Sequence, residues 1–152
     1  MRTVIVQHMT NLHREVEERL ADHDMRYTRG RRAVVAALAV ADGPRSASEL
    51  EGEIGRAVPL SSLYRSLTVL EEAGVVVPHH GARSLTRYEL AEWLTGHHHH
   101  FVCIQCGAVE DVEIPREREA QVRGLVEDLS VTASFTPLNH TLEIEGRCRK
   151  CA

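Results

Sequence analysis

The chain has 152 residues, 43% hydrophobic and 4% aromatic, and a formal net charge of −4. This composition excludes wholesale disorder, and no apolar run approaches the roughly 20 residues that a membrane-spanning helix needs. Because the N-terminus also has no apolar stretch long enough for a secretory signal, we expect a cytoplasmic protein with no membrane partner. The negative charge argues against nucleic-acid binding only for the second part of the chain. Residues 1–90 carry no net charge and hold four arginines within residues 26–32.

Apolar residues at helical spacing predict three helices before residue 59. The first is expected over residues 11–22. Thr28 is placed to cap the second helix, which Asp42-Gly43-Pro44 ends, and Ser46 with Glu49 forms a capping box for the third. The apolar positions expected to face the core are Leu12, Val16, Leu20, Val34, Val35, Leu38, Leu50 and Ile54.

A fourth helix is predicted between Ser61 and Ala73, with Leu63, Leu67 and Leu70 facing inward. Ser61 or Ser62 is expected to cap it, and Gly74 to end it. On the outward face, Arg65 is suited to guanine, and Tyr64 to a thymine methyl group or a phosphate. Ser61 and Ser62 are placed to donate to phosphate at the helix N-terminus. Ordinary exposed residues are the alternative interpretation.

Two short strands should follow, Val75–Val77 and Leu85–Leu90, with a turn-like segment from Pro78 to Ser84. His79 and His80 are expected on this turn, near solvent or phosphate rather than at a metal. Short helices followed by a hairpin are the order of a winged helix-turn-helix, with the fourth helix in the recognition position.

Composition changes at residues 91–96, which we interpret as a linker. A small α+β domain of about 55 residues is predicted beyond it. Such a domain is too small to be stable by its core alone, so a metal or a dimer partner should supply the missing stability. The expected elements are strands over 100–104, 108–114, 131–135 and 139–146 and a helix over 116–129, with Val122, Leu125, Val126 and Leu129 as its apolar face.

The four cysteines of the chain form two C-x-x-C pairs, Cys103 with Cys106 and Cys148 with Cys151. In a cytosolic chain this pattern favours a metal over disulfides. Two pairs complete a tetrahedron around Zn²⁺, and the closed shell leaves no position for water, so the site is predicted to be structural. A redox pair or buried thiols are the alternatives.

Four consecutive histidines, His97 to His100, precede the first C-x-x-C pair. If this run is extended, successive side chains point to opposite faces, so His97 and His99 chelate one metal and His98 and His100 another. His140 is expected on a strand of the same domain, as a further ligand or as a core histidine. A solvated loop is the alternative for the run.

In combination, these motifs resemble the ferric uptake regulator family. The resemblance rests on Leu60–Leu67, Leu70–Gly74 and Arg87–Leu90 in the first half, and on the histidine run, Cys103–Gly107 and His140–Cys148 in the second. It covers about residues 12–151. It implies a winged-helix domain (1–90), a hinge (91–96) and a zinc-stapled α/β dimerisation domain (97–152).

The resemblance also implies roles for individual residues. It assigns a hinge sensory site to His98, His100, Glu89 and, in a position typical of zinc-sensing members, Glu72. It assigns a third site to His97, His99, His140 and a glutamate, where Glu117 and Glu119 flank the expected position. It places Arg26 in the minor groove and Tyr64 with Arg65 on the bases.

The predicted function is therefore a homodimeric, metal-dependent repressor of metal homeostasis genes that binds a palindromic, AT-rich double-stranded DNA operator. Zn²⁺ is expected as the structural ion. The regulatory metal is left open between Zn²⁺, which is favoured with a tilt toward the zinc uptake regulator branch, and Fe²⁺ or Mn²⁺. Pro44-Arg45-Ser46 stands where iron- and peroxide-sensing members usually have a histidine, and Leu90-Ala91 stands where zinc-sensing members often have a cysteine. An iron or peroxide sensor is the alternative within the family. A metallohydrolase that uses the histidines is the alternative from another class, and without a H-E-x-x-H motif or nucleophile elbow we expect no enzyme.

Overall fold

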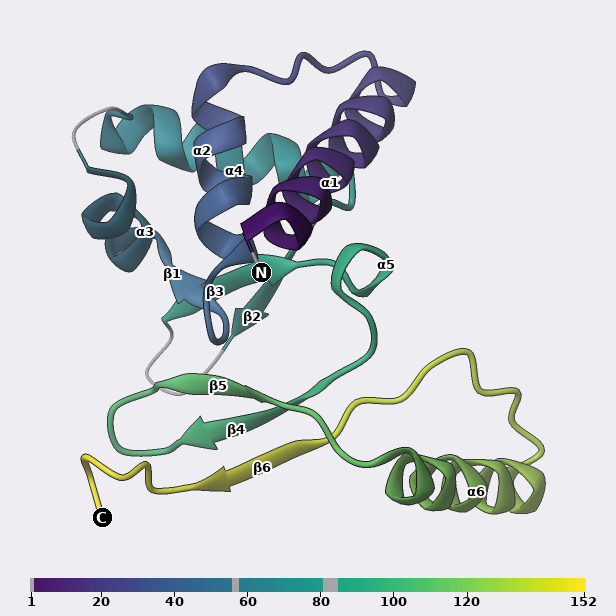
Figure 1. The fold of residues 1–152 in the computed structure, drawn as a ribbon. Coiled ribbons are helices and arrows are strands. Elements are labelled where there is room, and N and C mark those ends of the chain that lie inside the picture. Colours follow the sequence, from purple (N-terminus) through teal and green to yellow (C-terminus); the bar gives the residue numbers. More distant parts are fainter. Residues whose placement is uncertain (1, 56–57, 81–84) are drawn as a thin grey trace. The chain divides into compact units, whose positions relative to one another are not determined.

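The computed structural model describes residues 2–55, 58–80 and 85–152 and has the predicted α+β fold (Figure 1). The chain divides into two compact units, Met1–His97 and His98–Ala152. None of the helices in the described ranges is long and apolar enough to cross a membrane.

The first unit consists of helices around a small sheet. Its three strands are ordered β1-β3-β2, and both neighbouring pairs are antiparallel. The elements are α1 (Arg2–Asp22), α2 (Arg29–Ala39), β1 (Arg45–Ser46), α3 (Ala47–Ile54), α4 (Leu60–Glu72), β2 (Val76–His80), β3 (Thr86–Leu90) and α5 (Glu92–Thr95).

The predicted apolar positions form one core in this unit. Leu12, Val16 and Leu20 of α1 pack with the inward faces of α2, α3 and α4. Thr28 caps α2 by accepting from the backbone N–H of Arg31, and Ser46 and Glu49 form the capping box at α3. The two caps are confirmed, and they could be predicted because they rest on contacts within a few residues of the chain.

Three predictions for the first unit are wrong. The first helix begins at Arg2 rather than at residue 11. Helix α4 begins at Leu60 with Pro59 at its N-cap, so neither Ser61 nor Ser62 caps it; the N–H of Ser62 donates to the Pro59 carbonyl at 2.8 Å. Strand β2 extends to His80, since Pro78 does not interrupt its pairing with β3, so His79 and His80 lie in the strand and not on a turn. The rest of the predicted turn, residues 81–84, lies outside the described residues.

A buried arginine joins the hairpin to α3. Arg87 on β3 is only 6% exposed and donates to Glu49 Oε2 at 2.6 Å and to the Pro44 carbonyl at 3.2 Å. Burial by itself raises the pKa of the Glu49 carboxyl, but the backbone N–H of Ser46 and the Arg87 guanidinium outweigh it and hold this pKa below its ordinary value. Glu49 therefore contributes both to the helix cap and to the hairpin.

Because its carboxylate form is the bound one, replacing Glu49 with glutamine should destabilise the first unit at pH 7 by about 1 kcal/mol. A carboxyl whose pKa is lowered on folding stabilises the fold above its unfolded pKa of about 4.3 and loses that effect as the pH falls. The difference in the free energy of unfolding between E49Q and the parent chain should thus shrink toward pH 3. Thermal unfolding followed by the fluorescence of Trp93, the only tryptophan of the chain, measures it. The exposed neighbour Glu51, replaced in the same way, is the control, and a pH-independent difference would contradict the assignment.

The second unit is a three-stranded sheet with one helix, ordered β5-β4-β6. Strand β4 pairs antiparallel with β5 and parallel with β6. The elements are β4 (His99–Cys103), β5 (Val109–Val112), α6 (Arg116–Ala133) and β6 (Glu143–Gly146).

Two predictions for the second unit are wrong. Residues 131–133 belong to α6 instead of a strand, and Ser134 ends the helix in the left-handed region at φ 52°. The hydroxyls of Ser130 and Thr132 bond to carbonyls one turn back, which satisfies them inside the helix. Strand β6 begins only at Glu143, so His140 lies in the irregular segment that precedes it.

The segment expected as a linker contains α5. The indole N–H of Trp93 donates to the Gly74 carbonyl at 2.8 Å, and the Arg19 guanidinium lies 4.4 Å from the centre of the indole ring. These contacts attach residues 92–95 to the ends of α4 and α1 within the first unit.

Candidate metal centres and nucleic-acid interface

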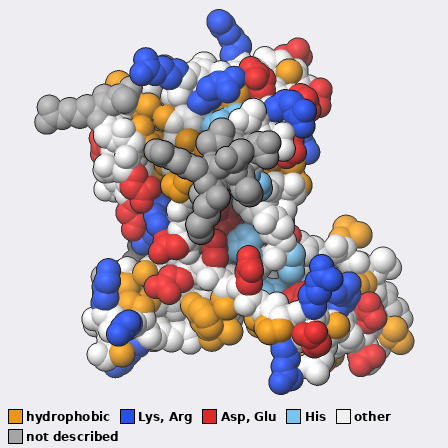
Figure 2. Space-filling view, viewed as in Figure 1, with side chains coloured by type: hydrophobic (Ala, Val, Ile, Leu, Met, Phe, Trp, Pro, Cys, Tyr) orange, Lys and Arg blue, Asp and Glu red, His pale blue; other side chains and the backbone are white. Residues whose placement is uncertain are grey.

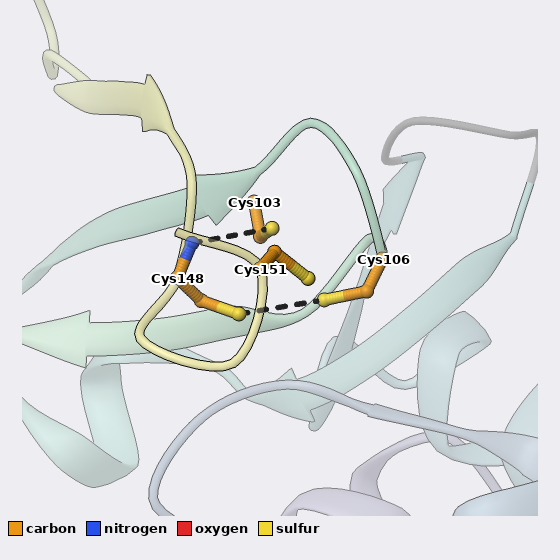
Figure 3. A group of neighbouring side chains, drawn as sticks. All are labelled: Cys103, Cys106, Cys148 and Cys151. Carbon is orange, nitrogen blue, oxygen red and sulfur yellow. Dashed lines mark hydrogen bonds between the residues drawn. The ribbon is translucent and has the colours of Figure 1, made fainter.

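The four cysteines meet at one edge of the second sheet (Figure 3). Cys103 ends β4, and the parallel register pairs it with Gly146, the last residue of β6. Parallel neighbours end at the same edge, so Cys148, two residues beyond β6, reaches the turn that holds Cys103 and Cys106. Each pair closes a tight turn, with the N–H of Cys151 donating to the Cys148 carbonyl at 2.9 Å.

The spacing of the sulfurs fits a tetrahedral cation. The Sγ atoms of Cys106 and Cys148 are 3.7 Å apart, and all four sulfurs lie within 4.8 Å of one another. A disulfide needs about 2.05 Å. A Zn–S bond of about 2.3 Å gives a tetrahedral edge of about 3.8 Å. The four thiols are free, and their geometry suits four ligands of one ion better than two disulfides.

The ionisation of these thiols also favours one shared cation. Backbone N–H groups of Cys106 and Cys148 lower the pKa of the Cys103 thiol to about 6. The hydrogen bond with Cys148, burial and the remaining thiols raise the pKa of Cys151 to about 12, because these contacts favour its protonated form. A cation at the centre would favour the ionised form of all four, and a soft thiolate set suits Zn²⁺.

Of the histidine run, His99 and His100 lie in β4, whereas His97 is at a bend and His98 precedes the strand. The side chains of His98 and His100 lie on one face and that of His99 on the other. On one face, the rings of His98 and His100 lie 5.1 Å apart at 88°. Their Nε2 atoms are 3.8 and 3.6 Å from the same oxygen of Asp111. This spacing is longer than a hydrogen bond and close to that of three ligands around one divalent ion.

On the other face, His99 is 1% exposed, and its Nε2 lies 2.8 Å from Glu119 Oε2. The second oxygen of Glu119 lies 3.1 Å from His140 Nε2, and the two imidazole rings are 5.6 Å apart. One carboxylate thus bridges two histidines, and the three side chains offer nitrogen and oxygen ligands to a transition metal.

Glu119 belongs to this group and Glu117 does not. Both are in the first turn of α6, where residues two apart point in directions about 200° apart, and Glu117 is exposed. His97, the last residue of the first unit, lies 2.8 Å from Glu92 through Nδ1. Its assignment to the third site stays a prediction.

Asp111 was missed by the sequence reasoning. The strand register pairs it directly with His100 across β5 and β4, and residues in such a pair share a face. Counting outward from the Cys103–Ala108 turn on both strands would have paired the same two residues. The two carboxylates that the resemblance assigned to the hinge site, Glu72 and Glu89, belong to the first unit. Glu72 is exposed at the end of α4, and Glu89 Oε1 lies 2.5 Å from His79 Nε2.

The predicted DNA-contacting residues lie on the outward side of the first unit's core. Tyr64 is 52% exposed and Arg65 is exposed, while the opposite face of α4 is buried through Leu63, Leu67 and Leu70. Arg26 is exposed before α2, and its carbonyl accepts from the Arg31 side chain, which orders this segment. Of the neighbouring arginines, Arg32 is committed to Glu17 at 2.9 Å.

Comparisons with known proteins agree with this architecture. The model of the ferric uptake regulator family matches residues 22–145. The chain is 35% identical over 101 residues to the ferric uptake regulation protein of Legionella pneumophila, which covers 65% of this chain and 68% of that protein. In this relative and in two further ferric uptake regulation proteins, from Vibrio parahaemolyticus and Neisseria meningitidis, the matched segment spans 60–68% of the protein's length.

Two solved structures are similar over most of the chain. The ferric uptake regulator of Helicobacter pylori, described as having three functional metal-binding sites, superposes with a TM-score of 0.73 at 22% identity and covers 94% of this chain and 93% of that one. The Vibrio cholerae ferric uptake regulator gives a TM-score of 0.67 at 26% identity, with coverages of 87% and 98%.

A helical unit with a β hairpin, followed by a small unit rich in metal-binding side chains, is the architecture of the metal-dependent transcription regulators that match this chain. The chain belongs to the ferric uptake regulator family. Members of this family are transcription regulators, so the hydrolase alternative is dropped.

Proposed function

We propose that the protein is a homodimeric repressor of metal homeostasis genes that binds a palindromic, AT-rich operator when a regulatory site at its hinge is filled. The observation that carries this proposal is the group His98, His100 and Asp111, in which His98 is the first residue of the second unit. Ligands at this position are next to the connection between the two units. When they share a cation with Glu89 and Glu72 of the first unit, they favour one arrangement of the recognition helices over others.

The remaining metal centres have supporting roles in this proposal. Cys103, Cys106, Cys148 and Cys151 hold a structural Zn²⁺ that staples the second unit. His99, Glu119 and His140, with His97, form a third site inside the dimerisation domain. Its effect on DNA binding is indirect, because it does not join the two domains.

A homodimer is supported by the surface of the second unit. Hydrophobic side chains reach its surface (Figure 2), and on α6 only Ser130 is buried. Leu125 and Leu129 are 59% and 61% exposed, although they stand in the helix's apolar stripe. A second copy of the same unit would cover this face and supply the core that about 55 residues lack.

We favour Zn²⁺ as the regulatory metal, because imidazoles with one or two carboxylates suit it well. Fe²⁺ and Mn²⁺ accept the same donors, and an iron- or peroxide-sensing repressor is the second candidate.

DNA binding titrated separately with buffered Zn²⁺, Fe²⁺, Mn²⁺ and Ni²⁺ tests the proposal and selects the metal. Binding that no metal enhances, or a monomer in sedimentation at all metal levels, would contradict it.

Arg65 should read a base in each half-site. Replacing it with alanine is expected to cost about 1–3 kcal/mol per recognition contact and to relax base preference at one position. R26A should also weaken binding, with an effect confined to operators with an AT-rich minor groove. Competition binding on a panel of single-base operator variants measures both. The exposed Arg14 on α1, replaced by alanine, is the control, and an R65A protein with unchanged affinity and preference would show that α4 is not the recognition helix.

A further inference from the structure

The hairpin of the first unit carries a histidine and a glutamate that face each other. The strand register pairs Val77 with Glu89 and His79 with Arg87, so His79 and Glu89 are diagonal neighbours on one face. Val76 and Leu90, on the other face, are buried in the core. The sequence had suggested a turn for His79, with solvent or phosphate beside it, whereas the structure places it inside β2.

The His79 Nε2 and Glu89 Oε1 atoms are 2.5 Å apart. In a tetrahedral zinc site with bonds of about 2.0–2.1 Å, two ligand atoms are about 3.3 Å apart. A cation that binds Glu89 therefore reaches His79 after the two atoms separate by only about 0.8 Å, which a small side-chain rotation supplies. Neither side chain needs a backbone change to bind the same ion.

Packing in the apolar core does not explain this pair. The apolar side chains of the hairpin, Val76 and Leu90, are on the opposite face, and the side chains of His79 and Glu89 are 22% and 14% exposed. The nearby cation, Arg87, is turned toward Glu49 and the Pro44 carbonyl. The pair thus combines one imidazole nitrogen and one carboxylate oxygen, which is a ligand combination typical of transition-metal sites.

We infer that His79 and Glu89 form a two-donor arm of the first unit for the regulatory divalent cation, so that the hairpin supplies a histidine ligand as well as a carboxylate. This inference rests on the proposed function, because it concerns the same sensory site. It adds an imidazole from the first unit to the carboxylates and histidines already proposed for that site. Metal binding then fixes both strands of the hairpin, β2 through His79 and β3 through Glu89.

The test is a Co²⁺ titration of the full chain with its cysteine-bound zinc retained, followed by visible absorption and by competition with a chelator. H79A should weaken binding at the regulatory site by at least about tenfold and change the absorption of the bound Co²⁺. H79D should recover much of the affinity, because a carboxylate replaces the lost ligand. If the pair were only an ion pair, H79D would instead place two like charges together and bind no better than H79A.

His80 provides the matched control. It is the adjacent histidine on β2, is exposed, and lies 3.4 Å from the Thr86 hydroxyl. H80A and H80D should leave affinity and spectrum unchanged, and H80D corrects for added negative charge. Unfolding temperatures of the zinc-loaded variants show whether each is folded.

The outcomes separate the two proposals. If E89Q and the double variant H98A/H100A weaken Co²⁺ binding while H79A does not, the two-donor arm is wrong and the sensory site stands. If E89Q and H98A/H100A also leave binding unchanged, the sensory site itself is wrong, and the arm with it. Tighter binding by H79A would likewise overturn the arm, because it would mean that His79 competes with the metal for Glu89.

Discussion

Replacing Cys148 with serine should unfold the second unit and abolish dimerisation, and replacing Cys103 with serine should have the same effect. A structural zinc site contributes on the order of 10 kcal/mol or more of apparent binding energy to folding. This is comparable to the whole stability of a small domain, which is about 5–15 kcal/mol. The sheet also depends on the site, because Cys103 ends β4 and Cys148 follows the neighbouring β6, so the metal would join the ends of both strands.

Zinc content, circular dichroism and sedimentation of the purified variants measure this result. The controls are Gln105 and Lys150, which stand inside the two C-x-x-C turns and are exposed; their serine variants should keep zinc, fold and dimer. A chelator strong enough to remove the ion should reproduce the effect of C148S on the parent chain. A folded, dimeric C103S protein would refute the structural-zinc assignment.

Mutating His98 and His100 to alanine should remove metal-dependent DNA binding and leave the dimer intact. These two side chains share a face with Asp111, and their loss leaves a cation with too few ligands to join the domains. A coupling of about 1–3 kcal/mol is typical of such linkage, so the metal-induced gain of roughly 5–150-fold in operator affinity should disappear. Asp111, replaced by asparagine, should give a weaker version of the same defect.

The double variant H97A/H99A is the matched comparison. His99 lies on the opposite face with Glu119 and His140, so its loss should lower DNA affinity in a smaller, graded way. Both double variants should keep one zinc per chain, since neither touches the cysteines. Metal stoichiometry and operator affinity are measured for both. Identical behaviour of the two pairs would mean that the two faces of β4 do not carry separate sites.

The sequence by itself determined the features that depend on neighbours within a few residues. The caps at Thr28 and Ser46, the inward leucines of α4 and the C-x-x-C turns are of this kind, and the structure has all of them. The alternation of the histidine run is local too, because an extended backbone turns successive side chains to opposite faces. These features were sufficient for the fold class and the family.

The tertiary structure decided which of these local pieces meet. That β6 lies parallel to β4, and so brings Cys148 to Cys103, depends on strand pairing across more than 40 residues. The choice of Glu119 over Glu117 depends on how α6 is rotated against the sheet, and the inclusion of Asp111 depends on the register of β4 with β5. Residues 131–133, which include the β-branched Val131 and Thr132, continue α6 instead of forming a strand. In each case the deciding energy comes from contacts between segments distant in the chain, which local propensity and spacing do not encode.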